Sequence, residues 1–243
     1  MRRLRFAAFG LTLAAVSCAA PPSGAAGARS PDPRLEEVDA PAVAYARLDP
    51  NACEAELVRR NISFTKVERA RGVLAPIRLS GPLRGVAFHT ALARAVRATS
   101  PYEIVDCRLA LSLDDFAGEL SAHDVVEVIH YSAYRPPEAS WPDDRVAARH
   151  AGALAIDIAS FIKRDGRTLE VLRDFHGRIG AHTCDAGSGP RPATPEAVEL
   201  RSIVCDATGS KLFNVALTPD FNRAHRNHFH LEVAAEASYF YVH

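Results

Sequence analysis

The chain has 243 residues, and its 29 lysines and arginines are balanced by 29 aspartates and glutamates, so the formal net charge at neutral pH is zero. We therefore expect no nucleic-acid partner, because phosphate binding depends on clustered Lys and Arg side chains and no basic face stands out in the sequence. No segment after the N-terminal region is long and apolar enough to be a transmembrane helix, which needs roughly 20 apolar residues.

The N-terminal segment has the pattern of a secretion signal over residues 1–17. Three arginines precede an apolar stretch over 6–16 that is too short to span a bilayer. Two forms of cleavage stay open. Residues 13–18 resemble a bacterial lipobox, which would leave a lipid-modified Cys18 at the mature N-terminus, whereas the Ala-rich site at 18–20 fits ordinary signal cleavage. We expect an exported protein, either free in the periplasm or lipid-anchored in the cell envelope.

The next stretch, residues 18–44, is rich in Ala, Pro, Gly and Ser and has no apolar periodicity. Such a segment cannot bury enough apolar surface to offset the entropy of ordering it, so we predict a flexible tether. Residues 45–243 are numerous enough for one well-buried domain.

Four cysteines follow Cys18, namely Cys53, Cys107, Cys184 and Cys205. An even number in an exported chain favours disulfides over free thiols. Three pairings are open, and we favour Cys53–Cys107 with Cys184–Cys205, because sequential pairing closes the shorter loops. No Cys-x-x-Cys spacing is present, so a cysteine zinc site is not expected.

Apolar periodicity predicts alternating helices and strands along the domain. Helices are expected over 49–59, 88–98, 107–120 and 171–179. Strands are expected over 77–79, 125–131, 153–162, 215–217 and 228–233. Loops are expected over 137–149 and 184–195. The absence of a regular βαβ rhythm predicts a single α+β domain, with a small, mostly antiparallel sheet flanked by helices.

The first chemically informative residue is Asp157, which lies within the apolar run 153–162. An unpaired carboxylate in a buried strand is expensive to desolvate, so a metal or a charged partner is indicated. A salt bridge or a backbone-capping role is the alternative. His150, at the end of the preceding polar loop, can converge on the same point.

Three histidines lie within six residues at positions 225–230. Side chains alternate along a strand, so His228 and His230 project from the same face. With His150 and Asp157, one of these two histidines completes a nitrogen, oxygen, nitrogen set that suits Zn²⁺ and leaves a position for water. A closed structural site would use both histidines, and this alternative stays open.

The pattern His150-x6-Asp157 followed by His228-x-His230 is similar to the zinc signature of the lysostaphin and D-alanyl-D-alanine carboxypeptidase group. The longer context resembles more closely the extensin-like C-terminal domain of bacterial exported proteins. The matching stretches are 131–135, 149–159, 165–166 and 218–231.

This resemblance implies one zinc ion per chain, held by His150, Asp157 and His230. It implies that His228 acts as a general base or transition-state stabiliser, and that His225 stabilises the intermediate or orients His228. Arg135 falls where the carboxypeptidases have an arginine that binds substrate or steadies the developing oxyanion. The expected substrate is peptidoglycan, cleaved by a monomeric D,D- or L,D-type murein peptidase or carboxypeptidase.

Two residues depart from the pattern of that group. Asn227 stands where the carboxypeptidases have a carboxylate general base, and an amide cannot take a proton from water at neutral pH. Either His228 is the base or activity is weak or absent. Ala148 stands where the group usually has a serine.

We therefore predict a zinc-dependent peptidase of the cell envelope that hydrolyses peptide bonds in peptidoglycan. The alternative is a non-catalytic, zinc-stabilised envelope domain that binds wall peptides or a partner, which Asn227 favours. A purely structural protein without a metal would leave Asp157 unexplained.

Overall fold

The computed structural model describes residues 39–235, 237 and 239–243. The predicted secretion signal, Cys18 and all but the end of the predicted tether lie outside the described residues. Within the described part of the chain, none of the helices combines the length and the apolar character needed to cross a membrane.

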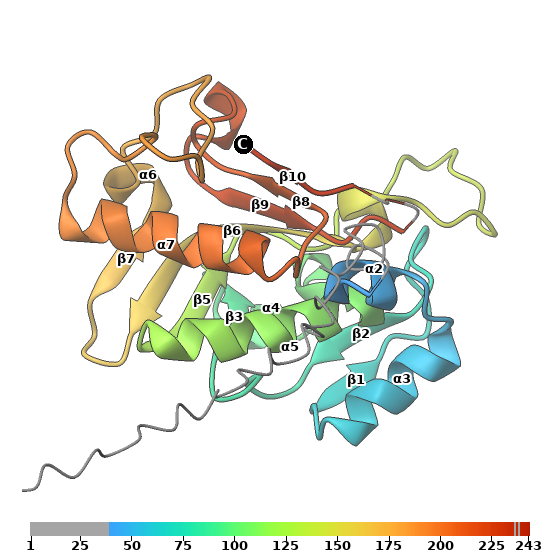
Figure 1. The fold of residues 1–243 in the computed structure, drawn as a ribbon. Helices are drawn as coiled ribbons and strands as arrows, with labels where there is room; N and C mark the ends of the chain where they lie inside the picture. The colour runs from blue at the N-terminus through green and yellow to red at the C-terminus, as the bar shows by residue number, and fades with distance from the viewer. Residues whose placement is uncertain (1–38, 236, 238) are drawn as a thin grey trace, which may run out of the picture. The chain divides into compact units, whose positions relative to one another are not determined.

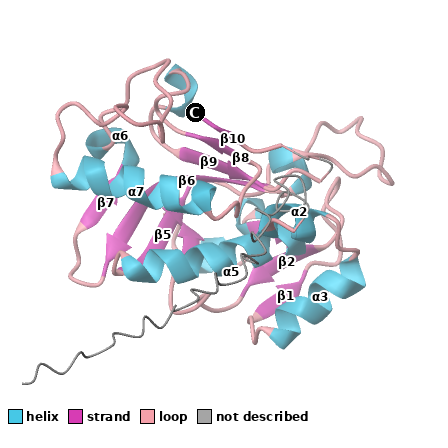
Figure 2. Cartoon of the chain, in the orientation of Figure 1, coloured by secondary structure: helices cyan, strands magenta, loops and turns pink. Residues whose placement is uncertain are grey.

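Two β-sheets form the framework of the domain (Figures 1 and 2). The smaller sheet is antiparallel, with the order β1 (Phe64–Lys66), β2 (Pro76–Leu79), β4 (Ile104–Asp106). The larger sheet has seven strands in the order β10-β8-β9-β6-β5-β3, with β7 paired to β6. These strands are β3 (Ala87–Thr90), β5 (Val125–His130), β6 (Ala155–Lys163), β7 (Thr168–Glu170), β8 (Val215–Leu217), β9 (Phe229–Glu232) and β10 (Tyr241–Val242).

The predicted α+β class is confirmed, but the predicted sheet is wrong. The larger sheet is mixed, because β3 runs parallel to β5 and β10 runs parallel to β8, whereas the other pairs are antiparallel. The predicted strands of this sheet did not include β3, β7 and β10. Strand β7 forms a hairpin with the preceding β6, whereas β3 and β10 pair with strands distant in sequence. The pairing of β3 and β10 is fixed by tertiary packing, which local patterns do not report.

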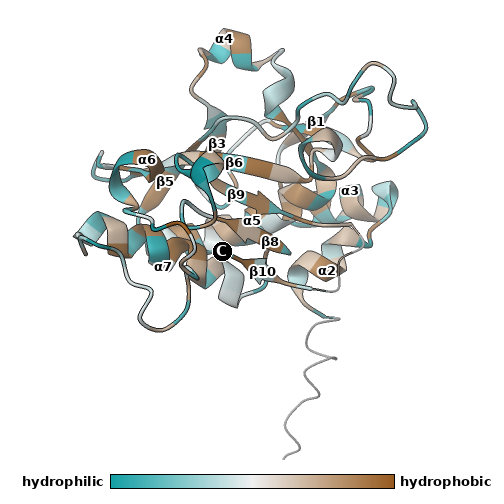
Figure 3. Cartoon of the chain, turned by 90° about the horizontal axis from the view of Figure 1, so that it is seen from above, coloured by the Kyte–Doolittle hydropathy of each residue, from teal (hydrophilic) through white to brown (hydrophobic). Residues whose placement is uncertain are grey.

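Six α-helices are described. They are α2 (Pro41–Ala46), α3 (Pro50–Arg59), α4 (Arg94–Arg97), α5 (Cys107–Ala122), α6 (Val171–Asp174) and α7 (Pro195–Gly209). The two long helices, α5 and α7, contact each other and lie on the same side of the seven-stranded sheet (Figure 1). Hydrophobic residues, brown in Figure 3, are concentrated on the sheet strands and on α5.

Helix α5 is the centre of the core. It begins at the N-cap Asp106, whose carboxylate accepts a hydrogen bond from the Arg108 amide. Leu109, Leu113 and Phe116 follow at helical spacing and are buried. Phe116 packs edge-on against Phe161 of β6, with ring centroids 6.5 Å apart. The periodicity that predicted this helix therefore corresponds to its contact with the sheet.

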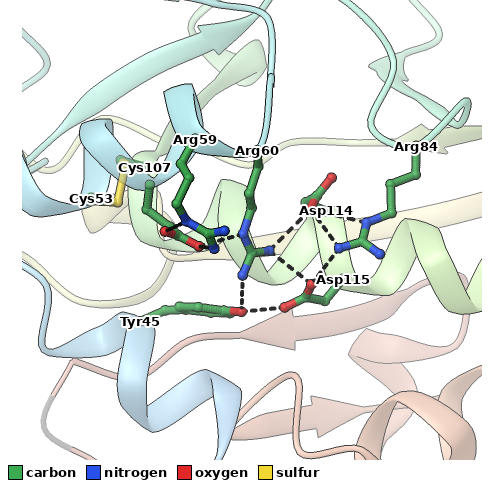
Figure 4. A network of polar contacts seen from close by, with 9 residues as sticks. Tyr45, Cys53, Arg59, Arg60, Arg84, Cys107, Asp114 and Asp115 are labelled. Atoms are coloured by element: carbon green, nitrogen blue, oxygen red, sulfur yellow. Dashed lines mark hydrogen bonds and ion pairs between the residues drawn. A yellow bond between two sulfur atoms is a disulfide. The ribbon is translucent and has the colours of Figure 1, made fainter.

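Polar and covalent links hold the first helices against α5 (Figure 4). A disulfide joins Cys53 of α3 to Cys107 of α5. Arg60, just after α3, lies 3.1 Å from Asp114 and 2.9 Å from Asp115 of α5. The second disulfide joins Cys184 and Cys205. Both disulfides have the predicted pairing.

Several predicted elements have different bounds in the structure. Residues 88–98 do not form one helix: β3 occupies the first part, because its residues pair with β5, and only the four-residue helix α4 follows. Helix α6 is shorter than the predicted helix over 171–179. Helices α2 and α7 were not predicted, and α2 begins at Pro41, within the predicted tether.

Candidate metal centre

The two central strands β6 and β9 place Asp157 and His230 directly opposite each other in the antiparallel register. On β9, Phe229 and Leu231 belong to the hydrophobic core, so the alternate residues, including His230, project from the other face. On β6, Ile156 belongs to the core in the same way. Asp157 and His230 therefore lie on the face of the sheet opposite α5 and α7.

His150 reaches this face from the 3-10 turn η2 (Arg149–Gly152), just before β6. The turn is tight: a Cβ atom at Gly152 would lie 2.1 Å from the Ala147 carbonyl oxygen, so only glycine fits there. Ala153, which follows, has a left-handed backbone with φ 52°. The turn directs the His150 ring toward β6. The Nδ1 atom of this ring lies 2.8 Å from the carbonyl oxygen of Ala133, which follows β5 in the chain.

Three ligand atoms converge from His150, Asp157 and His230, and all three residues are buried. His150 Nε2 lies 3.0 Å from Asp157 Oδ1 and 3.2 Å from His230 Nδ1. His230 Nδ1 lies 2.9 Å from Asp157 Oδ1. The structure thus brings together the three residues that the sequence predicted as metal ligands.

In His150 and His230, the outer ring nitrogen, which points away from the cluster, faces a hydrogen-bond acceptor. A carbonyl oxygen can only accept a hydrogen bond, so His150 Nδ1 donates to Ala133 and its Nε2 carries the lone pair toward the cluster in the neutral ring. His230 Nε2 lies 3.4 Å from Glu232 Oε2, which leaves Nδ1 toward the cluster. Two imidazole lone pairs and a carboxylate oxygen within this distance repel one another unless a cation or a proton lies between them.

The pKa shifts of Asp157 and His230 reflect the close contacts within the cluster. Burial raises the pKa of Asp157, but its close contacts with the His150 and His230 rings outweigh burial and hold the pKa well below its usual range. Burial opposes protonation of His230, yet Asp157 and Glu232 together raise its pKa.

The two oxygens of Asp157 have different partners. Oδ1 faces the two imidazoles, while Oδ2 accepts a hydrogen bond of 2.6 Å from Arg135. The Arg135 side chain is 52% exposed, so part of the guanidinium is accessible to a ligand. The predicted substrate-binding arginine therefore lies at the cluster and also orients one of its oxygens.

His228 and His225 lie beside the cluster. His228 Nε2 is 3.4 Å from Asp157 Oδ1, and the His225 ring centroid is 5.1 Å from that of His228 and 6.0 Å from that of His230. Burial lowers the pKa of His228 to about 4 and also lowers the pKa of His225. Both imidazoles are therefore neutral near pH 7, and the low pKa of His228 makes it a weak proton acceptor at that pH.

Asn227, the residue that departs from the carboxypeptidase pattern, contacts two side chains of the site. Its Nδ2 donates to the Tyr131 hydroxyl at 3.1 Å, which leaves its Oδ1 toward His228 Nδ1 at 3.0 Å. An amide oxygen can only accept, so His228 Nδ1 carries the proton and Nε2 is left as an acceptor on the cluster side. Asn227 thus fixes the tautomer of His228.

Sequence reasoning missed Glu232 and gave no role to Tyr131. The signal for Glu232 was present in the strand 228–233, because it alternates with apolar neighbours and shares the face of His228 and His230. The carboxylate is buried against His230, with Arg149 Nε at 3.7 Å.

The fold and the site define an α+β domain with a buried His, Asp and His cluster at the centre of a mixed sheet. A family model described as the extensin-like protein C-terminus matches residues 51–242, and the chain belongs to this family. No curated protein and no solved structure matches the chain.

Proposed function

We propose that His150, Asp157 and His230 bind one zinc ion. The observation that carries this proposal is the convergence of His150 Nε2, Asp157 Oδ1 and His230 Nδ1 in a buried site with both outer histidine nitrogens engaged. Two imidazoles and a carboxylate are a ligand set found in catalytic zinc sites, where a fourth position is left for water.

We further propose that the protein is a peptidase of the cell envelope that hydrolyses peptide bonds in peptidoglycan. When bound, zinc would supply acidification of water and polarisation of the scissile carbonyl. His228 presents Nε2 toward the site and accepts the proton from water. Arg135, half exposed beside Asp157, binds a substrate carboxylate or the oxyanion, and His225 supports the intermediate or orients His228.

The substrate class rests on the similarity of the His150, Asp157, His228 and His230 pattern to the lysostaphin and D-alanyl-D-alanine carboxypeptidase group. Export of the protein, either free into the periplasm or lipid-anchored in the cell envelope, agrees with this substrate. The two disulfides support export, because disulfides persist in oxidising compartments outside the cytosol. We expect the protein to act as a monomer.

A second candidate function is a non-catalytic, zinc-stabilised domain that binds wall peptides or a partner. Asn227 favours it, because no carboxylate stands at the position of the carboxypeptidase base. Its amide orients His228 instead, so the two candidates differ in whether His228 alone is a sufficient base.

The first test is the metal content of the purified mature protein beside an Asp157→Ala variant. We expect about one zinc ion per wild-type chain and loss of zinc in the variant. Circular dichroism of both proteins checks that the variant has not lost zinc merely because it is unfolded. A well-folded wild type that takes up no zinc, even when zinc is supplied, would exclude both candidate functions.

The second test is incubation of the zinc-loaded protein with purified peptidoglycan, followed by chromatography of the released products. New amino groups or free amino acids support the peptidase. Zinc binding without any hydrolysis supports the binding domain.

A further inference from the structure

Glu232 lies on the side of His230 that faces away from the cluster. Its Oε2 is 3.4 Å from His230 Nε2, while Nδ1 of the same ring lies 2.9 Å from Asp157 Oδ1. The imidazole therefore separates two carboxylates, one at each ring nitrogen. The Glu232 side chain is only 7% exposed, so its charge is largely removed from water and needs a partner inside the protein.

The backbone holds Glu232 firmly in this position. Glu232 is the last residue of β9, a strand paired on both sides, opposite Ala155 of β6 and Val215 of β8. The backbone carbonyl oxygen of Glu232 also accepts a hydrogen bond of 2.8 Å from the backbone N–H of Asn214. Because side chains two residues apart share a face of a strand, this backbone fixes the Glu232 carboxylate beside His230.

We propose that Glu232 is a positioning residue for the metal centre, an inference that rests on the proposed zinc site. Its carboxylate accepts the Nε2 proton of His230, so the lone pair of Nδ1 points toward His150 and Asp157. A metal-bound histidine whose outer N–H meets a carboxylate is held in one tautomer and one orientation, and becomes a stronger ligand.

The two histidines of the cluster are supported differently. His150 donates its outer proton to the neutral Ala133 carbonyl at 2.8 Å, which fixes the ring without adding charge. His230 has a carboxylate instead. Glu232 and Asp157 are the two carboxylates at the His230 ring, and Arg149, 3.7 Å from Glu232, and Arg135, 2.6 Å from Asp157, offset part of their negative charge. Removing the Glu232 charge should therefore weaken metal binding while the three ligands remain.

The chain offers a matched control on the same sheet. Glu127 of β5 lies 2.9 Å from His89 Nε2 of β3, so it is also a strand glutamate paired with an imidazole. Neither Glu127 nor His89 belongs to the metal cluster. Glu232→Gln and Glu127→Gln make the same chemical change, and only the first removes a carboxylate from a candidate ligand.

The experiment measures the zinc affinity of the mature protein by competition with a chromogenic chelator. We expect Glu232→Gln to bind zinc roughly 10–100-fold more weakly than the wild type, and Glu127→Gln to bind it as the wild type does. Thermal unfolding of the metal-free proteins checks that both variants fold. Glu232→Gln with wild-type zinc affinity would overturn the role of Glu232 and leave the zinc site intact.

A second measurement needs no variant. Nitrogen-15 NMR of the histidine rings in the zinc-loaded wild type should show His230 with its proton on Nε2 and the metal on Nδ1. A His230 ring with the proton on Nδ1 would overturn the inference. A wild type that binds no zinc would overturn the proposed function, and with it the role of Glu232.

Discussion

Arg135 donates to Asp157 Oδ2 at 2.6 Å, and Oδ1 of the same carboxylate faces His150 and His230. The two oxygens are thus divided between an arginine that is half exposed and a pair of buried imidazoles. This division favours a metal bound through Oδ1 alone, with Arg135 holding the carboxylate in the required orientation.

The first prediction concerns Arg135. Arg135→Ala should lower kcat/KM for peptidoglycan hydrolysis by roughly 10²-fold, as does the removal of one donor to a developing oxyanion. Zinc should still bind at saturating concentration, because Asp157 and both histidines remain, although Asp157 loses the contact that orients it. Hydrolysis rates and metal content are measured on the same preparations. Arg167→Ala, which removes an exposed arginine that pairs with Asp165, serves as the control. Equal rates for the two variants would remove Arg135 from the catalytic machinery.

The second prediction separates metal binding from proton transfer. His228→Ala should keep its zinc and lose roughly 10²–10⁴-fold in the rate of hydrolysis, since a positioned general base contributes that much. His123→Ala, a histidine that contacts Asp206 and is not part of the cluster, should retain the wild-type rate. Peptide release by His228→Ala at an undiminished rate would show that another group accepts the proton.

The third prediction concerns the turn that presents His150. Gly152→Ala would bring a Cβ atom to 2.1 Å from the Ala147 carbonyl oxygen, so the backbone must shift. We expect the free energy of unfolding to fall by about 1–3 kcal/mol, the range for overpacked sites. Zinc affinity should fall as well, because His150 moves with the turn. Both are measured by urea unfolding and chelator competition.

The control for that turn is Gly209→Ala at the end of α7, where an added Cβ meets no atom within 4 Å. It should leave zinc affinity unchanged. If Gly152→Ala matches Gly209→Ala in both measurements, the turn is not what positions His150.

Parts of the fold and site could be predicted from the sequence because local chemistry determined them. Helix α5 shows its apolar period directly, and Asp157 stands out as a carboxylate within an apolar strand. Strand β3 could not be predicted, because its residues become a strand only by pairing with β5. Helix α7 has a local signal at its start, because the Thr194 hydroxyl caps its first turn and Pro195 occupies its first position.

The residues of the site also divide into those that could be predicted from the sequence and those that could not. The convergence of His150, Asp157 and a histidine of the His228–His230 pair could be predicted from residue types and spacing, and the family resemblance pointed to His230. The roles of Asn227 and Glu232 depend on which imidazole nitrogen each one meets, and that follows only from the positions of β9 and its neighbours. Asn227, which from sequence alone counts against activity, orients His228 in the folded protein.

The last prediction concerns alkaline stability and Tyr45. The Tyr45 hydroxyl donates to Asp115 and accepts from Arg60 at 2.6 Å (Figure 4). Burial, with the hydrogen bond to Asp115 adding to it, raises the pKa of Tyr45 from 10.0 to about 12. The phenol is an acid whose pKa is higher in the folded protein than in the unfolded chain. Its contribution to stability is therefore full below pH 10 and is lost as the pH rises from 10 toward 12.

The measurement is the free energy of unfolding in urea across this alkaline range, for the wild type and for Tyr45→Phe. Other tyrosines and lysines titrate in both proteins, so their contribution cancels in the difference between the two. We expect the wild type to be the more stable protein below pH 10, and the difference to shrink steadily above it. A difference that stays constant would mean that the Tyr45 hydroxyl ionises as readily in the folded protein as in the unfolded chain, and that Asp115 and Arg60 hold the helices together without its proton.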